Sequence, residues 1–247
     1  NFISEKVGNN TLLFTIDTPS KAALDCGTIK DKAFVTVDFR VGDPEPHFKI
    51  QRDYNGYGPY VNSEFYTGKH DLWGDEHHTV DADAVANTLD LMLKMNASVN
   101  FYMFCGGTNF AFFNGANGDT SYYQGIPTSY DFDSPINEAG DMTFKYEKIK
   151  EVIKKYRKVR EFSDVKNTSK KSYGKVAFNQ GVSLFDSLDI LTNRMKTSEK
   201  PLSFEELDVD YGFILYKKTI DKIGFLNLGN VNDRANVFIN KKWIKTV

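Results

Sequence analysis

Short apolar runs alternate with helix-like segments through residues 12–162, and this alternation constrains the fold more than any other feature. The runs cover residues 12–16, 34–39, 59–64 and 98–105. Each is apolar almost throughout, as expected of strands buried on both faces of a parallel sheet. The repeated order of strand and helix therefore predicts an α/β domain, either half of a (β/α)8 barrel or part of a doubly wound sheet.

The two longest helical signals follow the third and fourth runs. In residues 79–97, Thr79 is placed to cap the N-terminus and apolar residues recur on one face. In residues 143–162 the apolar stripe consists of Ile149, Ile153 and Tyr156. The lysines between them are expected in solvent, so each helix should pack on the sheet through one face.

The pattern changes after residue 162. Residues 163–172 are polar and predict a linker. Strand-like runs separated by turns then follow, at residues 173–178, 211–220, 223–229 and 235–243. Residues 173–247 are therefore expected to be the start of an all-β domain. The chain begins just ahead of its first apolar run, and we expect it to be part of a longer protein.

Charge and composition exclude several classes of function. The net charge is −2, which favours neither nucleic acid nor an anionic membrane surface as a partner. No apolar stretch approaches the ~20 residues of a membrane span. Two cysteines make neither a disulfide framework nor a zinc motif. Glycosylation triplets at Asn9, Asn96 and Asn167 favour a secreted context.

An acidic residue stands at the end of each of the first three runs. Glu64 closes the third run, between Asn62 and Tyr66, while Asp17 and Asp38 follow the first and second. The carboxyl ends of barrel strands form the active face, so a catalytic carboxylate is one interpretation. Glycoside hydrolysis requires such a group among polar and aromatic side chains. The alternatives are an ion pair for Glu64 and helix capping for the two aspartates.

No metal or cofactor site is predicted. His77 and His78 are adjacent in sequence, and adjacent residues rarely share one tetrahedral ion. Residues 106–110 lack the lysine and the glycine spacing of a phosphate loop, so they are expected to form a tight turn. Cys105 ends the fourth run and is interpreted as an inert core thiol.

Four longer motifs resemble one known family. They are NSEFYTG at 62–68, ASVNFYMFCGGTNFAFFNGAN at 97–117, PTSYDFDSPINEAGD at 127–141 and KYEKIKEVIKKY at 145–156. Together they resemble glycoside hydrolase family 35, the acid β-galactosidases of animal lysosomes and their secreted relatives. The resemblance implies that residues 1–162 form strands five to eight of a (β/α)8 catalytic barrel. Residues 163–172 would then be a linker, and residues 173–247 a truncated β domain.

The resemblance also implies roles for individual residues. Glu64 matches the family nucleophile, and Tyr102 matches a tyrosine that contacts galactose. Asn62, Tyr66 and Phe132 are the further substrate-binding candidates. Phe132 stands where the family usually has a tyrosine, which removes one hydrogen bond to the sugar.

The chain differs from the family pattern in three further ways. Lys69 stands where the family commonly has a tryptophan. Cys26 matches a cysteine whose family partner lies upstream, and would be unpaired here. The acid/base glutamate of the family lies in a motif similar to ENEYG, which this chain does not contain.

The implied function is retaining hydrolysis of terminal β-D-galactose from glycoconjugates, without a cofactor, by the full-length protein. A lysosomal, vacuolar or secreted location follows, with a β-galactoside glycan as partner and a homo-oligomer left open. The alternatives are a non-catalytic galactose-binding relative and a retaining exo-glycosidase for another sugar. The isolated chain is expected to be inactive and to associate through unpaired strand edges.

Overall fold

The computed structural model describes residues 2–8, 10–29, 31–118, 122–160, 165–192, 195–229, 231–232 and 234–247. Asn9 and the expected boundary at residue 162 lie outside these ranges. The chain divides into two compact units, which are described separately. The first comprises Asn1–Asn109 with Ile126–Ser169, and the second comprises Phe110–Gly125 with Lys170–Val247.

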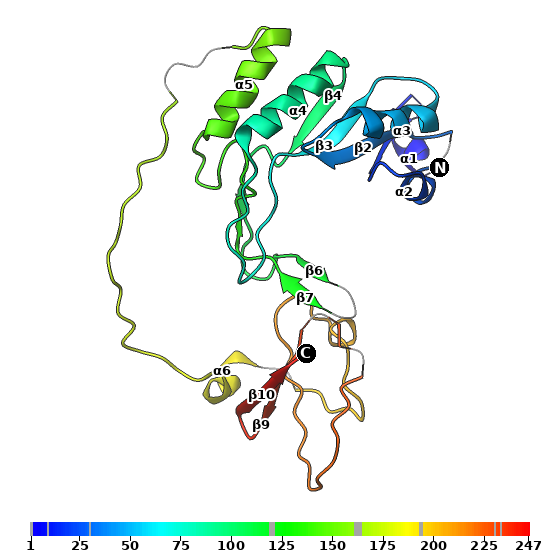
Figure 1. The fold of residues 1–247 in the computed structure, drawn as a ribbon. Helices are drawn as coiled ribbons and strands as arrows, with labels where there is room; N and C mark the ends of the chain where they lie inside the picture. Colours follow the sequence, from blue (N-terminus) through cyan, green and yellow to red (C-terminus); the bar gives the residue numbers. More distant parts are fainter. Residues whose placement is uncertain are drawn as a thin grey trace. The chain divides into compact units, whose positions relative to one another are not determined.

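A four-stranded parallel sheet forms the first unit (Figure 1). Its strands, in sheet order, are β1 (Phe14–Asp17), β2 (Phe34–Arg40), β3 (Val61–Tyr66) and β4 (Ser98–Tyr102). The helices that connect them are α2 (Lys21–Gly27), α3 (Glu45–Asn55) and α4 (Ala82–Lys94). The α/β class with a parallel sheet is therefore confirmed, and all four carboxyl ends meet at one edge of the sheet.

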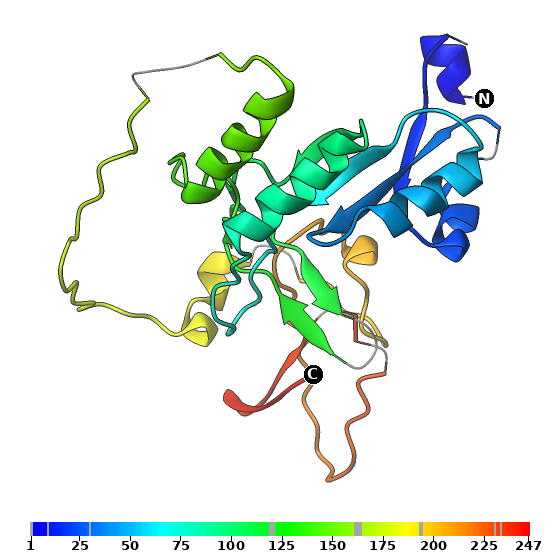
Figure 2. The same cartoon turned by 45° about the horizontal axis from the view of Figure 1, so that its top comes forward.

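Helix α5 (Phe144–Tyr156) lies beside α4 against this sheet, as Figures 1 and 2 both show. The hydroxyl of Thr143 accepts the N–H of Tyr146 and caps α5. The helix ends at Tyr156, because Arg157 is extended. The buried side chains of α5 are Lys145, Ile149 and Val152. Ile153 and Tyr156 pack partly buried at the margin of the core, so the expected stripe is correct but is centred nearer the first turn.

The expectation that Thr79 caps α4 is wrong. The cap is Asp81, whose carboxylate accepts the N–H of Asp83. The N–H of Val80 instead donates to a carboxylate oxygen of Asp133 at 2.6 Å. The bond to Asp133 fixes the backbone just before the helix, which begins after Asp81.

The strand edge expected to promote association is present at β1, which pairs only with β2 among the described residues. Phe14 is 59% exposed and Ile16 is 42% exposed on that strand. Association through this edge stays a prediction. Among the described residues, no helix combines the length and the apolar character needed to cross a membrane.

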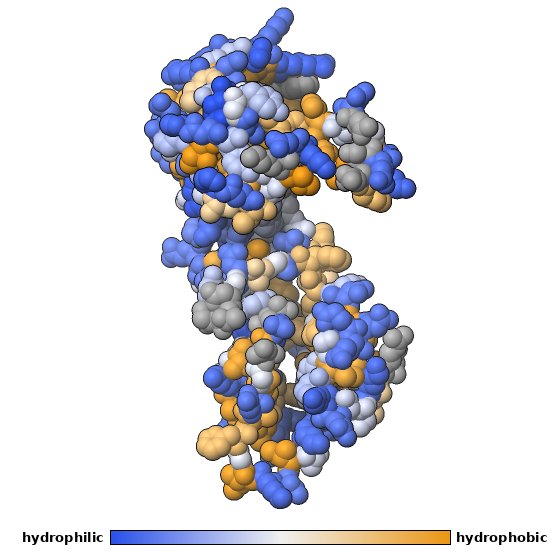
Figure 3. Space-filling model, turned by 90° about the vertical axis from the view of Figure 1, so that its right-hand side faces the viewer, coloured by the Kyte–Doolittle hydropathy of each residue, from blue (hydrophilic) through white to orange (hydrophobic). Residues whose placement is uncertain are grey.

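The second unit has little regular structure. Its paired strands are β6 (Ala116–Gly118) with β7 (Tyr123–Gly125), and β9 (Asn236–Ile239) with β10 (Lys242–Thr246). Of the four runs expected as strands, only the last forms a hairpin, while residues 173–178, 211–220 and 223–229 have irregular backbone. A strand needs a partner and a covered face. Phe178 is 94% exposed and Phe225 is fully exposed, so neither face is covered here. Figure 3 shows apolar side chains, in orange, at the surface.

Candidate active site

Two carboxylates and a phenol meet at the carboxyl ends of β2 and β3. Asp38 and Glu64 are register partners on the two strands, and Tyr66 follows Glu64 by two residues, on the same face of β3. The Tyr66 hydroxyl lies 2.7 Å from Asp38 Oδ2 and 2.8 Å from Glu64 Oε2. The phenol has a single hydroxyl proton, which it can donate fully to only one carboxylate at a time, so Asp38 and Glu64 share this donor and both are held near it.

Burial raises the pKa of the Tyr66 hydroxyl, and the hydrogen bonds to Asp38 and Glu64 raise it further. The phenol is therefore neutral over the physiological range and serves as a donor. The other oxygen of Asp38, Oδ1, is buried and has no hydrogen-bond partner among the described residues. Asp38 is thus oriented by Tyr66 alone.

Asp17 does not join this group. Its register partner on β2 is Val37, and its carboxylate accepts the N–H of Thr18. Its Oδ2 also lies against Gly27 of α2, where an added Cβ would come within 2.2 Å of it. Of the three acidic residues at strand ends, the structure brings together only Asp38 and Glu64.

Aromatic rings extend the site across β4. Tyr102 is the register partner of Tyr66, and their rings are 5.9 Å apart in an edge-to-face arrangement. The Tyr102 hydroxyl lies 3.3 Å from that of Tyr130, on β8 (Ser129–Tyr130). Burial raises the pKa of Tyr130, with smaller contributions from Tyr102 and Glu64. The hydroxyl of Tyr66 therefore contacts Glu64, and those of Tyr102 and Tyr130 lie next to one another.

Phe132 and Asn62, two further substrate-binding candidates, are both buried. The Phe132 ring packs 5.5 Å from Tyr102 and 5.4 Å from Tyr130, and the residue is only 4% exposed. Asn62 is fully buried. Its amide donates to the Phe39 carbonyl, and its oxygen accepts the N–H of Glu64 at 3.2 Å. Strict alternation would place Asn62 on the same face of β3 as Glu64. The register of β3 shifts between Asn62 and Phe65, however, and Asn62 lies in the core, from where it positions the Glu64 backbone.

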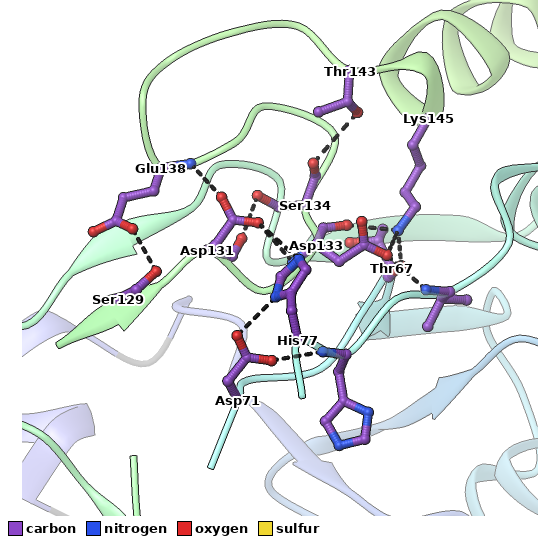
Figure 4. A network of polar contacts seen from close by, with 12 residues as sticks. Thr67, Asp71, His77, Ser129, Asp131, Asp133, Ser134, Glu138, Thr143 and Lys145 are labelled. Carbon is purple, nitrogen blue, oxygen red and sulfur yellow. Dashed lines mark hydrogen bonds and ion pairs between the residues drawn. The ribbon is translucent and has the colours of Figure 1, made fainter. Parts of the chain in front are cut away.

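A buried ion pair anchors the segment that carries Phe132 (Figure 4). The ammonium group of Lys145 donates to Asp133 Oδ2 at 2.6 Å, to the Asp133 carbonyl at 2.6 Å and to the Thr67 carbonyl at 2.8 Å. Burial lowers the pKa of Lys145, against the opposing effect of Asp133. At Gly68, an added Cβ would lie 1.8 Å from the Phe132 carbonyl. The end of β3 and the Phe132 segment are therefore in direct backbone contact.

His77 joins a second part of the same network (Figure 4). Its Nδ1 lies 2.7 Å from Asp71 Oδ2, and its Nε2 lies 3.9 Å from Asp131 Oδ1. The hydrogen bond to Asp71 raises the pKa of His77, against the opposing effect of burial. The N–H of Glu138 donates to Asp131 at 2.8 Å, and the Ser129 hydroxyl donates to the Glu138 carboxylate. This network connects the segment after β3 with the one that carries Tyr130.

The tight turn predicted at residues 106–110 is not formed, and Gly106 instead packs against the segment that carries Asp131. The N–H of Gly106 donates to the Ile136 carbonyl at 2.8 Å, and an added Cβ there would lie 2.8 Å from the Asp131 carbonyl. Gly107 and Thr108 form the short strand β5, which pairs with β8. Cys105 is exposed, so its interpretation as a core thiol is wrong. The regular part of β4 ends at Tyr102, before the chain reaches the cysteine.

Sequence reasoning missed the structural roles of Lys145, Asp133 and His77. One signal for Lys145 was available, because positions 145, 149, 152 and 156 share one face of a helix. Asp133 pairs with Lys145, 12 residues away, and accepts the N–H of Val80, 53 residues away. His77 pairs with Asp71, 6 residues away, and no local pattern marks any of these contacts.

This arrangement, a parallel sheet whose carboxyl edge carries an oriented carboxylate among tyrosines, is typical of α/β domains that place their functional sites at strand ends. A family model described as Glycosyl hydrolases family 35 matches residues 1–156. The chain therefore belongs to glycosyl hydrolase family 35.

Several curated relatives are similar over most of the chain. It is 43% identical to a β-galactosidase of Bos taurus over 245 residues, which cover 96% of this chain and 37% of the relative. It is 44% identical to a β-galactosidase of Homo sapiens over 217 residues, covering 87% of this chain and 31% of the relative. A β-galactosidase-1-like protein of Mus musculus is 41% identical. The chain thus spans about a third of the length of these relatives.

Proposed function

We propose that the full-length protein containing this chain is a retaining β-galactosidase that releases terminal β-D-galactose from glycoconjugates. The observation that carries the proposal is the Glu64 carboxylate at the end of β3, held at 2.8 Å by the Tyr66 hydroxyl in a family 35 chain. A nucleophile must be ionised and aimed, and a hydrogen bond from a neutral phenol supports both requirements.

In the proposed reaction, Glu64 attacks the anomeric carbon and forms a covalent galactosyl ester as the bond to the leaving oxygen breaks. A general acid protonates that oxygen, and the same group then takes a proton from the water that hydrolyses the ester. No residue of this chain is assigned that second role. Tyr66 orients the nucleophile, while Tyr102 and Tyr130 contribute hydroxyl groups to the sugar site.

The finer architecture belongs to the same proposal. The four parallel strands would be strands five to eight of a (β/α)8 barrel formed within residues 1–162. Residues 163–172 would be the linker, and residues 173–247 the start of a β domain. A lysosomal, vacuolar or secreted location is consistent with the three glycosylation triplets.

The nucleophile can be tested with a fluorinated galactosyl compound that traps the covalent ester in the full-length protein. Peptide mapping is expected to place the label on Glu64. The Glu64→Gln variant should lose at least about 10³-fold in kcat, the order of effect expected when a nucleophile is removed. Glu151→Gln, on the exposed side of α5, is the matched control and should retain turnover. A label on another residue would refute the assignment.

Phe132 favours one alternative, a galactose-binding protein without turnover, since a phenyl ring cannot make the hydrogen bond of a tyrosine. Calorimetry with galactose, alongside hydrolysis of nitrophenyl β-galactoside, β-glucoside and β-glucosaminide, separates the possibilities. Binding without any turnover supports the alternative, and preferred cleavage of another glycoside supports a different sugar specificity.

A further inference from the structure

A small pocket opens beside Tyr66 at the carboxyl ends of β2 and β3, and its lining is basic. The pocket has a volume of about 200 Å³. Arg40, Lys69 and His78 contribute to its walls, and no acidic residue does. Because a water molecule occupies about 30 Å³ in the liquid, the space exceeds what one or two waters would fill.

The two permanent cations of this pocket have no acidic partner in the part of the chain that the structure describes. Neither Arg40 nor Lys69 takes part in an ion pair or a side-chain hydrogen bond there. The nearby carboxylates already have other partners: Asp71 has His77, Asp133 has Lys145, and Asp38 and Glu64 have Tyr66. The positive charge is therefore not required to neutralise the protein's own acids.

The electrostatic environment of the neighbouring His70 also indicates positive charge beside the pocket. His70 follows Lys69 in the chain, and its pKa is lowered, first by burial and then by the positive charge of Lys69. The charge of Lys69 thus acts on this side of the site. Lys69 and His78 are half-buried, and charges interact more strongly where water is partly excluded.

Tyr66 connects the pocket to the candidate nucleophile. Its side chain lines the pocket, while its hydroxyl lies 2.8 Å from Glu64 Oε2. A sugar bound over Glu64 would therefore have a substituent within reach of this pocket.

We propose that this pocket is a subsite for an anionic group carried by the sugar substrate, either a sulfate ester or a carboxylate, with Lys69 and Arg40 as its donors. The proposal rests on the glycosidase function proposed above and specifies the substrate class of the same site. Guanidinium and ammonium groups bind such oxyanions through charge-assisted hydrogen bonds, and these are about twice as strong as neutral ones.

The test compares three substrates of the full-length protein: nitrophenyl β-galactoside, its 6-sulfate, and the corresponding 6-carboxylate, nitrophenyl β-galactosiduronate. The measured quantity is the ratio of kcat/KM for each anionic substrate to that for the neutral one. Lys69→Met is expected to lower the ratio by about tenfold, the effect of losing one charge-assisted hydrogen bond. Lys69→Arg should retain it. The control, Lys49→Met, removes an exposed lysine of α3 and should leave the ratio unchanged.

The two anionic substrates distinguish the chemistry of the group. If Lys69→Met lowers the kcat/KM ratio for the 6-sulfate alone, the pocket is a sulfate subsite. If it lowers the ratio for the 6-carboxylate alone, the pocket is a carboxylate subsite. An equal loss for both assigns an anion subsite without further selection. Ratios that are the same in Lys69→Met and in the unaltered protein would overturn the proposal.

A binding measurement separates this proposal from the proposed function. Calorimetry compares the affinities of galactose 6-sulfate, galacturonate and galactose for the unaltered protein and for Lys69→Met. If the neutral galactoside is not hydrolysed, the glycosidase proposal fails, and the affinity ratios still decide the subsite. A loss of at least about fivefold in the anionic-to-neutral affinity ratio supports it, and any smaller change overturns it.

Discussion

The ion pair between Lys145 and Asp133 makes the sharpest stability prediction of this structure. Lys145 is 3% exposed, and its three hydrogen bonds join the start of α5 to the end of β3 and to the Phe132 segment. Replacing Lys145 with methionine keeps the length of the side chain but leaves the Asp133 carboxylate without its cation.

The expected cost follows from burial. Breaking a buried ion pair by removing one partner destabilises a protein by about 3–5 kcal/mol. The Asp133 side chain is 23% exposed and keeps its hydrogen bond from the Val80 N–H, so the lower end, about 3 kcal/mol, applies. Because each 1.4 kcal/mol is a factor of ten, local opening around this segment should increase about a hundredfold.

Hydrogen–deuterium exchange of the full-length protein measures this opening at two amides. The N–H of Val80 donates to Asp133, and the N–H of Ser134 donates to the Asp131 carbonyl. Both should lose about a hundredfold in protection in Lys145→Met. Adding Asp133→Asn to that variant should restore part of it, because the uncompensated charge is then absent.

The control is Lys148→Met, which removes a lysine one turn along α5 whose ion pair with Asp83 is largely exposed. Exposed pairs contribute at most about 1 kcal/mol, so exchange at Val80 and Ser134 should change little. Equal protection in Lys145→Met and Lys148→Met would show that the buried pair does not hold the segment, and would refute the reasoning.

Three further predictions concern the site. Tyr66→Phe removes the donor that Asp38 and Glu64 share. The kcat of the full-length protein should therefore fall by about 10- to 100-fold, the range for a hydrogen bond to a charged group. An unchanged kcat would exclude an orienting role for Tyr66. The hydrogen bond to Asp71 raises the pKa of His77 above its ordinary value of 6.5, so its stabilising effect is complete below pH 6.5 and is lost as the pH rises through the raised value. Exchange in residues 71–78, corrected for intrinsic rates, should be faster at pH 8 than at pH 6, and His77→Gln should abolish the difference. Gly68→Ala would place a Cβ 1.8 Å from the Phe132 carbonyl oxygen, so the Phe132 segment must shift. Thermal stability and activity should therefore both fall. A variant with unaltered melting temperature and kcat would contradict this contact.

Local patterns were sufficient for the elements of the first unit. Four apolar runs predicted the four parallel strands, and one apolar face each predicted α4 and α5, because periodicity and burial are encoded residue by residue. The same reasoning failed for residues 173–229, where apolar content predicted strands. An extended run becomes a strand only when another chain segment pairs with it, and that pairing is not a property of the run itself.

The sequence by itself determined that Glu64 lies near the carboxyl end of a strand, where parallel sheets place reactive groups. Only the tertiary structure decided which neighbours it has. Strand register brings Asp38 and Tyr66 to it across two strands, and the shift of register between Asn62 and Phe65 leaves Asn62 in the core. The burial of Lys145 was likewise decided by a partner on another segment, Asp133. The physical reason is the same in each case: alternation and helical period are local, whereas the desolvation and pairing of a charge depend on contacts between distant parts of the chain.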